Sequence, residues 1–95
     1  MSRVRYSREA EDDLVEILLY TVEQWGEAQA DRYADELEAC CESLLRNPGL
    51  GRRCDDFWPG FRRIERKRHV IFYLADEEGI FVARILHENR LPQRR

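Results

Sequence analysis

The chain has 95 residues, the length of one small domain with a single hydrophobic core. A core of this size fills the space between one sheet and a pair of helices and leaves no deep cavity for a cofactor. No apolar run approaches the roughly 20 residues that cross a bilayer, and the N-terminus lacks the pattern of a signal peptide. The sequence therefore predicts one soluble cytoplasmic domain over residues 1–95 that needs no cofactor.

Charge is unevenly distributed along the chain, although the net charge is only −3. Residues 1–45 carry four Arg and twelve acidic residues, a net charge of −8. Residues 46–95 carry eleven Arg, one Lys and seven acidic residues, a net charge of +5. A basic half of this kind indicates a surface for nucleic acid or for an acidic protein partner. The alternative is that acidic helices and a basic sheet neutralise each other within the fold.

The three cysteines, Cys40, Cys41 and Cys54, match neither a disulfide framework nor a zinc site. Their number is odd, the first two are adjacent, and the paired Cys-x-x-Cys or Cys/His spacings of a zinc site are missing. We expect Cys40 or Cys41 to pack as a small apolar residue on a helix, which suits a reducing compartment. No metal site is predicted.

Taken in order, the chain begins with a short strand, in which Val4 and Tyr6 alternate with arginines, and continues into a helix over residues 8–25. Ser7 is a suitable N-cap, and the acidic residues after it favour the first turns of a helix. Gly26 ends the helix with a left-handed cap. We expect the apolar residues at helical spacing to face the core; they are Ala10, Leu14, Ile17, Leu18, Thr21 and Trp25.

A second helix is predicted over residues 27–46, directly after Gly26. The short connection makes the two helices an antiparallel hairpin. The sequence Asn47-Pro48-Gly49 ends the second helix, and an irregular segment over residues 50–60 follows. The core-facing stripe of this helix consists of Ala30, Tyr33, Ala34, Leu37, Cys40 or Cys41, Leu44 and Leu45.

Two apolar, β-branched and aromatic runs, residues 69–74 and 80–87, predict a β-hairpin that turns at Asp76-Glu-Glu-Gly79. A four-residue loop pairs Tyr73 with Val82 and Ile71 with Arg84. One face is then entirely apolar and is predicted to face the core; it holds Val70, Phe72, Leu74, Phe81, Ala83 and Ile85. The opposite, partly polar face holds His69, Ile71, Tyr73, Val82, Arg84 and Leu86.

A third C-terminal strand is predicted over residues 61–65, joined to the hairpin by a tight turn at Arg66-Lys67. With a two-residue turn, Arg62 lies opposite Ile71 and on the same face as Arg84. The order β-α-α-β-β-β predicts an α+β fold, in which the helical hairpin packs on one face of a mostly antiparallel sheet. Residues 89–95 lack periodicity and are predicted to form a loose tail.

Short motifs lie in a characteristic order and spacing over roughly residues 4–88. In the N-terminal half they are Tyr6-Ser-x-x-Ala10-x-x-Asp13-Leu14-x-x-Ile17, Tyr20-Thr21 and Trp25-Gly26-x-x-Gln29-Ala30-x-x-Tyr33. In the C-terminal half they are Leu44-x-x-Asn47-Pro48-x-x-Gly51-Arg52, Gly60-x-Arg62-Arg63, His69-x-Ile71-Phe72-Tyr73 and Arg84-Ile85-Leu86-His87. Together these motifs resemble those of the ParE toxins, a branch of the RelE/ParE superfamily of bacterial type II toxin–antitoxin modules.

The resemblance implies a growth-inhibiting toxin that a ParD-like antitoxin holds inactive in a hetero-oligomer. It also implies that the toxin acts by binding DNA gyrase rather than by catalysis, and that the toxin alone does not bind DNA sequence-specifically. One departure follows His87, where ParE-like chains often continue with Met-Asp and this chain continues with Glu88-Asn-Arg-Leu91. Leu91 can replace the Met as an apolar plug, but the acidic residue is missing.

Two alternatives remain open. RelE-like relatives on the same fold are ribosome-dependent mRNA endonucleases, and a shared fold does not decide the activity. The polar sheet face, with two arginines, a histidine and Tyr73, carries enough groups for a minimal nuclease. However, Lys67 is the only lysine and no tyrosine follows Tyr73, which argues against that activity. The second alternative is a binding module without toxicity.

We therefore assign no catalytic residue and predict a surface that binds antitoxin or target. Arg62 and Arg84 would repel each other on one face unless an acidic partner segment covered them. The loop residues Phe57 and Trp58 are either a lid over the core or an anchor for a partner. The alternative for His69 is a structural hydrogen bond across the sheet. The predicted contact residues are Arg62, Arg84, His69, Tyr73, Phe57 and Trp58.

Overall fold

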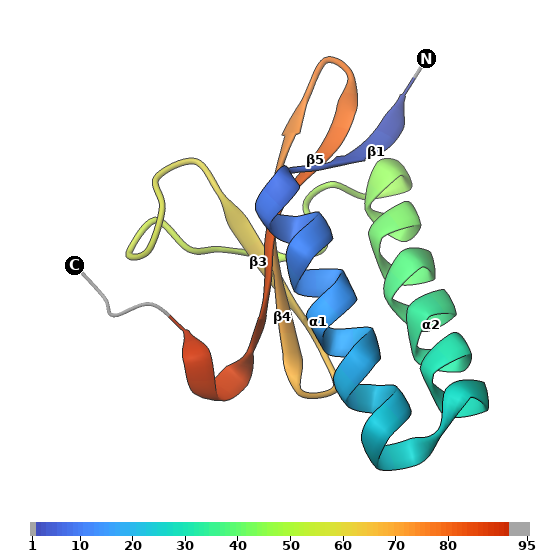
Figure 1. Cartoon of the computed structure of the whole chain (residues 1–95). Coiled ribbons are helices and arrows are strands. Elements are labelled where there is room, and N and C mark those ends of the chain that lie inside the picture. Colours follow the sequence, from blue (N-terminus) through green and yellow to red (C-terminus); the bar gives the residue numbers. More distant parts are fainter. Residues whose placement is uncertain (1, 92–95) are drawn as a thin grey trace.

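A computed structural model describes residues 2–91 and shows two layers, a helical hairpin and a five-stranded sheet (Figure 1). The strands have the order β1-β5-β4-β3-β2, with β1 parallel to β5 and the other pairs antiparallel. This confirms the predicted α+β fold, to which it adds the unpredicted two-residue strand β2. The elements are β1 (Arg3–Tyr6), α1 (Arg8–Trp25), α2 (Glu27–Arg46), β2 (Arg52–Arg53), β3 (Arg62–Arg66), β4 (His69–Asp76), β5 (Gly79–His87) and the 3-10 turn η1 (Glu88–Arg90).

Both helices begin and end where the sequence predicts, because their end signals are local. The Ser7 hydroxyl accepts the backbone N–H of Ala10 at 2.9 Å and donates to the carbonyl of Ala83 at 2.6 Å, so the cap also ties α1 to β5. Gly26 has φ 89° and ψ 168°. That region is essentially open to glycine alone, although it is not the left-handed helical conformation that we expected. No helix within residues 2–91 is long and apolar enough to cross a membrane.

The prediction that Trp25 belongs to the core is wrong, because 73% of its surface is exposed. The last turn of α1 extends past the end of the sheet, so no strand lies beneath this residue (Figure 1). Most of the other predicted core residues of the two helices are buried. On the helix side, Ala10, Ile17, Thr21, Leu37 and Leu44 are all buried, and Cys41 packs among them as a small apolar residue.

The faces of β4 are the reverse of those predicted, and Val82 of β5 is reversed with them, whereas Ile85 lies in the helix-covered core as predicted. Tyr73 lies opposite Val82, as expected, but Phe72 then lies opposite Arg84 and leaves Ala83 as an extra residue in a β-bulge. Ile71 is therefore opposite Ile85 rather than Arg84. The bulge resets the alternation along β5. As a result, the helix-covered core contains Ile71, Tyr73, Ile80, Val82 and Ile85.

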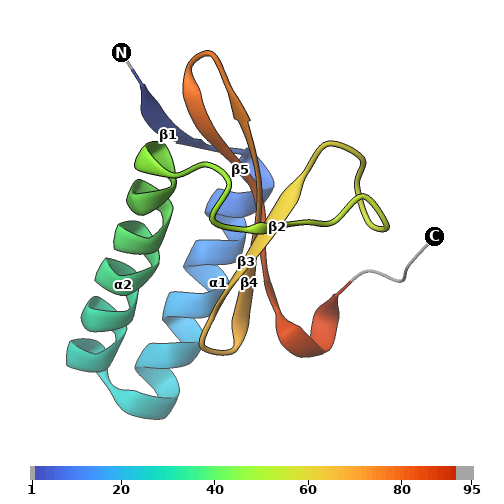
Figure 2. The same cartoon turned by 180° about the vertical axis from the view of Figure 1, so that it is seen from behind.

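A second apolar cluster lies on the sheet face away from the helices, where the loop between β2 and β3 folds over the sheet (Figure 2). The ring of Trp58 meets Phe72 edge-on with centroids 4.8 Å apart, and the ring of Phe57 lies 6.1 Å from Phe72. Leu91 packs against the same cluster, as expected of an apolar plug. The loop aromatics therefore form a lid over this face.

The turn between β3 and β4 consists of Lys67 and Arg68, because Arg66 pairs with His69. Lys67 adopts φ 55° in this turn. The turn lies one residue later than predicted, which shifts the pairing by two residues. Arg62 is thus opposite Tyr73, and the prediction that it lies opposite Ile71 is wrong.

Candidate functional site

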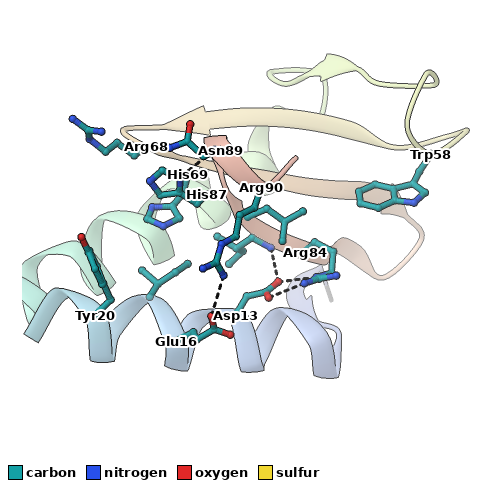
Figure 3. A pocket seen from close by; sticks show the side chains of 13 residues that line it. Asp13, Glu16, Tyr20, Trp58, Arg68, His69, Arg84, His87, Asn89 and Arg90 are labelled. Atoms are coloured by element: carbon teal, nitrogen blue, oxygen red, sulfur yellow. Dashed lines mark hydrogen bonds and ion pairs between the residues drawn. The ribbon is translucent and has the colours of Figure 1, made fainter. Parts of the chain in front are cut away.

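A groove of about 800 Å³ lies between α1 and the last part of β5 (Figure 3). Strand β1 ends at Tyr6, opposite Val82. On the edge of β5 away from β4, residues 84–87 are therefore flanked by α1 and η1 and not by a strand. The groove is lined by polar and apolar side chains from both layers. They include Asp13, Glu16, Ile17 and Tyr20 of α1, Arg84, Ile85, Leu86 and His87 of β5, and Trp58, Arg68, His69, Asn89 and Arg90.

The centre of the groove is formed by an ion pair between Arg84 and Asp13. The guanidinium donates through Nε to Asp13 Oδ2 at 2.8 Å and through Nη2 to Oδ1 at 2.9 Å. The same carboxylate accepts the backbone N–H of Ile85 at 3.0 Å. A two-point contact of this kind fixes both partners, and the Asp13 carboxylate raises the pKa of Arg84 above its usual range.

The other two arginines of the groove are held much more loosely. Arg90 reaches Glu16 at 3.4 Å, and both side chains are about three-quarters exposed. An exposed pair of this kind contributes little to stability. Arg68 has no ion-pair partner among residues 2–91. Two cations are therefore available to a carboxylate that enters the groove.

The two histidines lie side by side at one end of the groove, with ring centroids 5.4 Å apart (Figure 3). The hydroxyl of Tyr33 is 2.6 Å from His69 Nδ1 and 3.2 Å from the carbonyl of Arg66. Burial, and then the nearby Glu36, raise the pKa of Tyr33 to about 12, so the hydroxyl keeps its proton. Burial, and then His87, lower the pKa of His69.

Aromatic side chains mark both ends of the groove, with Tyr20 near the histidines and Trp58 beyond Arg84 (Figure 3). Tyr20 is 62% exposed, whereas Trp58 is half-buried against Phe72. Aromatic residues and arginines are enriched at surfaces that bind other polypeptides. Within residues 2–91 no group of three or more His, Cys, Asp or Glu side chains is arranged to hold a metal ion.

The structure brings together three of the six predicted contact residues, His69, Arg84 and Trp58. Tyr73 is wholly buried, which contradicts its predicted role as a contact residue. Its hydroxyl donates to the carbonyl of Pro48 at 2.7 Å and accepts the N–H of Gly51 at 2.8 Å.

Arg62 is also outside the groove, because its Nη1 donates to the carbonyl of Gly51 at 2.8 Å. The predicted pairing of Arg62 with Arg84 across Ile71 is therefore wrong. The four groups considered for a minimal nuclease are not gathered at one site, since Arg62 and Tyr73 do not line the groove. Phe57 is part of the lid over the outer cluster and does not line the groove either.

Four residues of the groove were not predicted from the sequence: Asp13, Tyr20, Arg68 and Arg90. A signal existed for Asp13, because Asp13 and Arg84 both belong to the family-like motifs. An acidic and a basic residue in such motifs are candidates for an ion pair. Arg68 and Arg90 gave no such signal, because they stand in a turn and in the predicted loose tail, and only the fold brings them together.

Comparisons with known proteins agree with this architecture. A family model described as ParE toxin of type II toxin-antitoxin system, parDE, matches residues 4–92. A solved structure titled as the chromosomal ParDE TA system from P. aeruginosa superposes with a TM-score of 0.76 over 92% of this chain and 96% of that chain, at 24% identity. At this identity the match speaks for the fold alone.

Curated relatives extend the similarity to the sequence. Toxin ParE1 of Mycobacterium tuberculosis is 39% identical over 92% of this chain and 90% of its own length. Toxin ParE1 of Caulobacter vibrioides is 36% identical over 94% and 92%, and Toxin ParE of Escherichia coli is 38% identical over 84% and 79%. The chain therefore belongs to the ParE toxin family of type II toxin–antitoxin systems.

Proposed function

We propose that this toxin blocks growth by binding DNA gyrase in the cytoplasm, without catalysing a reaction, and that a ParD-like antitoxin neutralises it. We further propose that an acidic amphipathic segment of the antitoxin occupies the groove between α1 and β5. The single observation that carries the second part is the pair of loosely held arginines, Arg68 and Arg90, beside an exposed tyrosine.

Two properties of the groove support a polypeptide ligand. Its volume of about 800 Å³ is large enough to hold several side chains of a bound segment. The Asp13 carboxylate already accepts three hydrogen bonds, so its charge is largely compensated. An entering carboxylate would therefore meet Arg68, which has no ion-pair partner in residues 2–91, and Arg90, which is only loosely paired with Glu16.

The gyrase part of the proposal is tested with a supercoiling assay on purified proteins. We expect the toxin to inhibit supercoiling and the antitoxin, added in equimolar amount, to restore it. Normal gyrase activity together with mRNA cleavage on ribosomes would replace this function with that of a RelE-like endonuclease. Normal growth during induced expression without antitoxin would instead indicate a non-toxic binding module.

The groove part is tested by charge reversal at the two loosely held arginines. We expect Arg68→Glu and Arg90→Glu each to weaken antitoxin binding at least tenfold in titration calorimetry, with a smaller loss at high salt because charge pairs are screened. Arg3→Glu, an exposed reversal on β1 outside the groove, is the matched control. If all three variants bound the antitoxin with equal affinity, the proposal that the antitoxin occupies the groove would be wrong.

A further inference from the structure

Helix α1 carries an apolar stripe that neither the sheet nor α2 covers. Six large hydrophobic side chains are exposed among residues 2–91, and five of them, Val15, Leu19, Tyr20, Val22 and Trp25, are on this helix. At 100° per residue, Val15, Leu19 and Val22 lie within about 60° of one another and about 150° from the buried face of the helix. We call these three residues the outer stripe; Trp25, 73% exposed, lies at its C-terminal end.

The neighbouring helix shows that the outer stripe is a feature of α1 in particular. Helix α2 is longer, and its buried apolar residues, including Tyr33, Leu37 and Leu44, all face the core. It exposes no large hydrophobic side chain. Since contiguous apolar residues on a solvent face mark interaction sites, the outer stripe indicates that a second molecule covers α1.

The charges beside the outer stripe define what can cover it. Asp12, Glu16 and Glu23 are exposed and fall within about 40° of one another along one side of the stripe. Helix α1 contains six acidic residues and one arginine, a net charge of −5. Two copies of the chain joined stripe to stripe would bring these acidic rows together, and like charges across an interface cost affinity. A basic partner avoids that cost.

The acidic row also links the outer stripe to the groove, because Glu16 borders the stripe and lines the groove. A bound segment that leaves the groove across α1 therefore passes over this acidic row. It then reaches Leu19 on the outer side of the same helix. We propose that the outer stripe of α1 docks a second part of the antitoxin, an amphipathic helix whose apolar side is flanked by Lys or Arg. This rests on the proposed function, in which the antitoxin occupies the groove.

The antitoxin would thus contact the toxin with two segments of opposite charge, an acidic one in the groove and a basic-flanked helix on α1. The amphipathic-helix mode predicts anchors at i, i+4 and i+7 on the toxin side, which is the spacing of Val15, Leu19 and Val22. Because the stripe is already exposed in the free toxin, changing it does not remove a core contact.

Titration calorimetry with the purified cognate ParD-like antitoxin tests this proposal. We expect Leu19→Ser and Val22→Ser each to weaken binding at least tenfold while the melting temperature of the toxin stays that of the unchanged chain. Leu50→Ser, which removes an apolar residue that is 52% exposed in the loop before β2, is the control and should bind normally. Glu23→Lys, outside the groove, should also weaken binding, because it reverses a charge opposite the basic flank.

The outcomes separate the two proposals. If the unchanged toxin does not bind the antitoxin, the proposed function fails and this inference fails with it. If the unchanged toxin binds and Leu19→Ser binds equally well, only the docking of a helix on α1 is overturned. A toxin dimer in light scattering that Leu19→Ser dissociates would also overturn it, because a second copy would then cover the stripe. If Glu23→Lys bound the antitoxin more tightly, the prediction that basic residues flank the antitoxin helix would be wrong.

Discussion

Arg84 and Asp13 join the last strand of the sheet to the first helix through a two-point ion pair, with N···O distances of 2.8 and 2.9 Å. The two residues are 71 positions apart in the chain. The Asp13 carboxylate also accepts the N–H of Ile85. This residue lies beyond Val82, the last residue of β5 that pairs with β1. The carboxylate therefore takes the place of a neighbouring strand and forms the floor of the groove.

Removing this carboxylate should destabilise the fold. In Asp13→Ala, the half-exposed guanidinium of Arg84 and the N–H of Ile85 both lose their acceptor. We expect the free energy of unfolding to fall by about 2–4 kcal/mol, measured by urea denaturation. Asp12→Ala removes an exposed neighbouring acid with no ion-pair partner in residues 2–91 and should stay within about 0.5 kcal/mol. Equal losses in the two variants would mean that the ion pair is not structural.

Helices were predictable from the sequence because the signals that define them are local. The ends of α1 are marked by Ser7 with the acidic first turn and by Gly26, all of which lie next to the ends that they define. The 3.6-residue period defines the buried side of the helix. The period fails at Trp25, because it carries no information about where the sheet ends. The period also does not explain why an apolar residue such as Leu19 lies on the solvent side of the helix. We explain that residue by contact with a partner.

The sheet faces were not predictable, because the decisive contacts are between distant residues. Tyr73 was predicted on the partly polar face, yet it lies in the helix-covered core, where its hydroxyl is hydrogen-bonded to Pro48 and Gly51 of a segment without regular structure. The bulge at Ala83 then breaks the alternation on which the face assignment rested. The groove depends on the same non-local pairing, since Arg84 reaches Asp13 only after the bulge has reset the strand.

Acidification should weaken the fold through His69. Burial, and then His87, hold its folded-state pKa below the usual 6.5. The unfolded chain therefore binds a proton that the folded chain does not, and stability is full above pH 6.5 and falls as the pH drops below it. Urea denaturation between pH 7.5 and 5.0 should show this decrease in the native chain.

The variant His69→Gln isolates that contribution. It cannot be protonated in this range, so its stability should be lower overall but should change less between pH 7.5 and 5.0. The pKa values of Asp55 and Asp76 are lowered, chiefly by the Gly60 N–H and by the Arg5 guanidinium respectively. These two carboxylates therefore change the stability only below about pH 4, outside the range of the experiment. An unchanged slope in His69→Gln would show that this histidine is not the group responsible.

Gly51 should tolerate no side chain. A Cβ at this position would lie 2.6 Å from both the carbonyl oxygen of Arg63 and the hydroxyl of Tyr73, so backbone or the buried tyrosine would have to move. We expect Gly51→Ala to cost about 1–3 kcal/mol, measured by thermal and urea unfolding. Gly49→Ala is the matched control, because its Cβ would meet only Asn47 Oδ1 at 4.0 Å. A stable Gly51→Ala would mean that the Tyr73 hydroxyl does not hold this segment.

The two tryptophans should respond oppositely to substitution and to quenchers. Trp58 packs edge-on against Phe72 at 4.8 Å, so Trp58→Ala should lower the free energy of unfolding by about 2 kcal/mol, less than for a fully buried tryptophan. Trp25 is largely exposed, and Trp25→Phe should leave stability within about 0.5 kcal/mol. Acrylamide should quench the emission of Trp58→Phe, which reports Trp25, more strongly than that of Trp25→Phe. If Trp58 instead proved freely quenched and its removal harmless, the loop would be a partner anchor rather than a lid over the outer cluster.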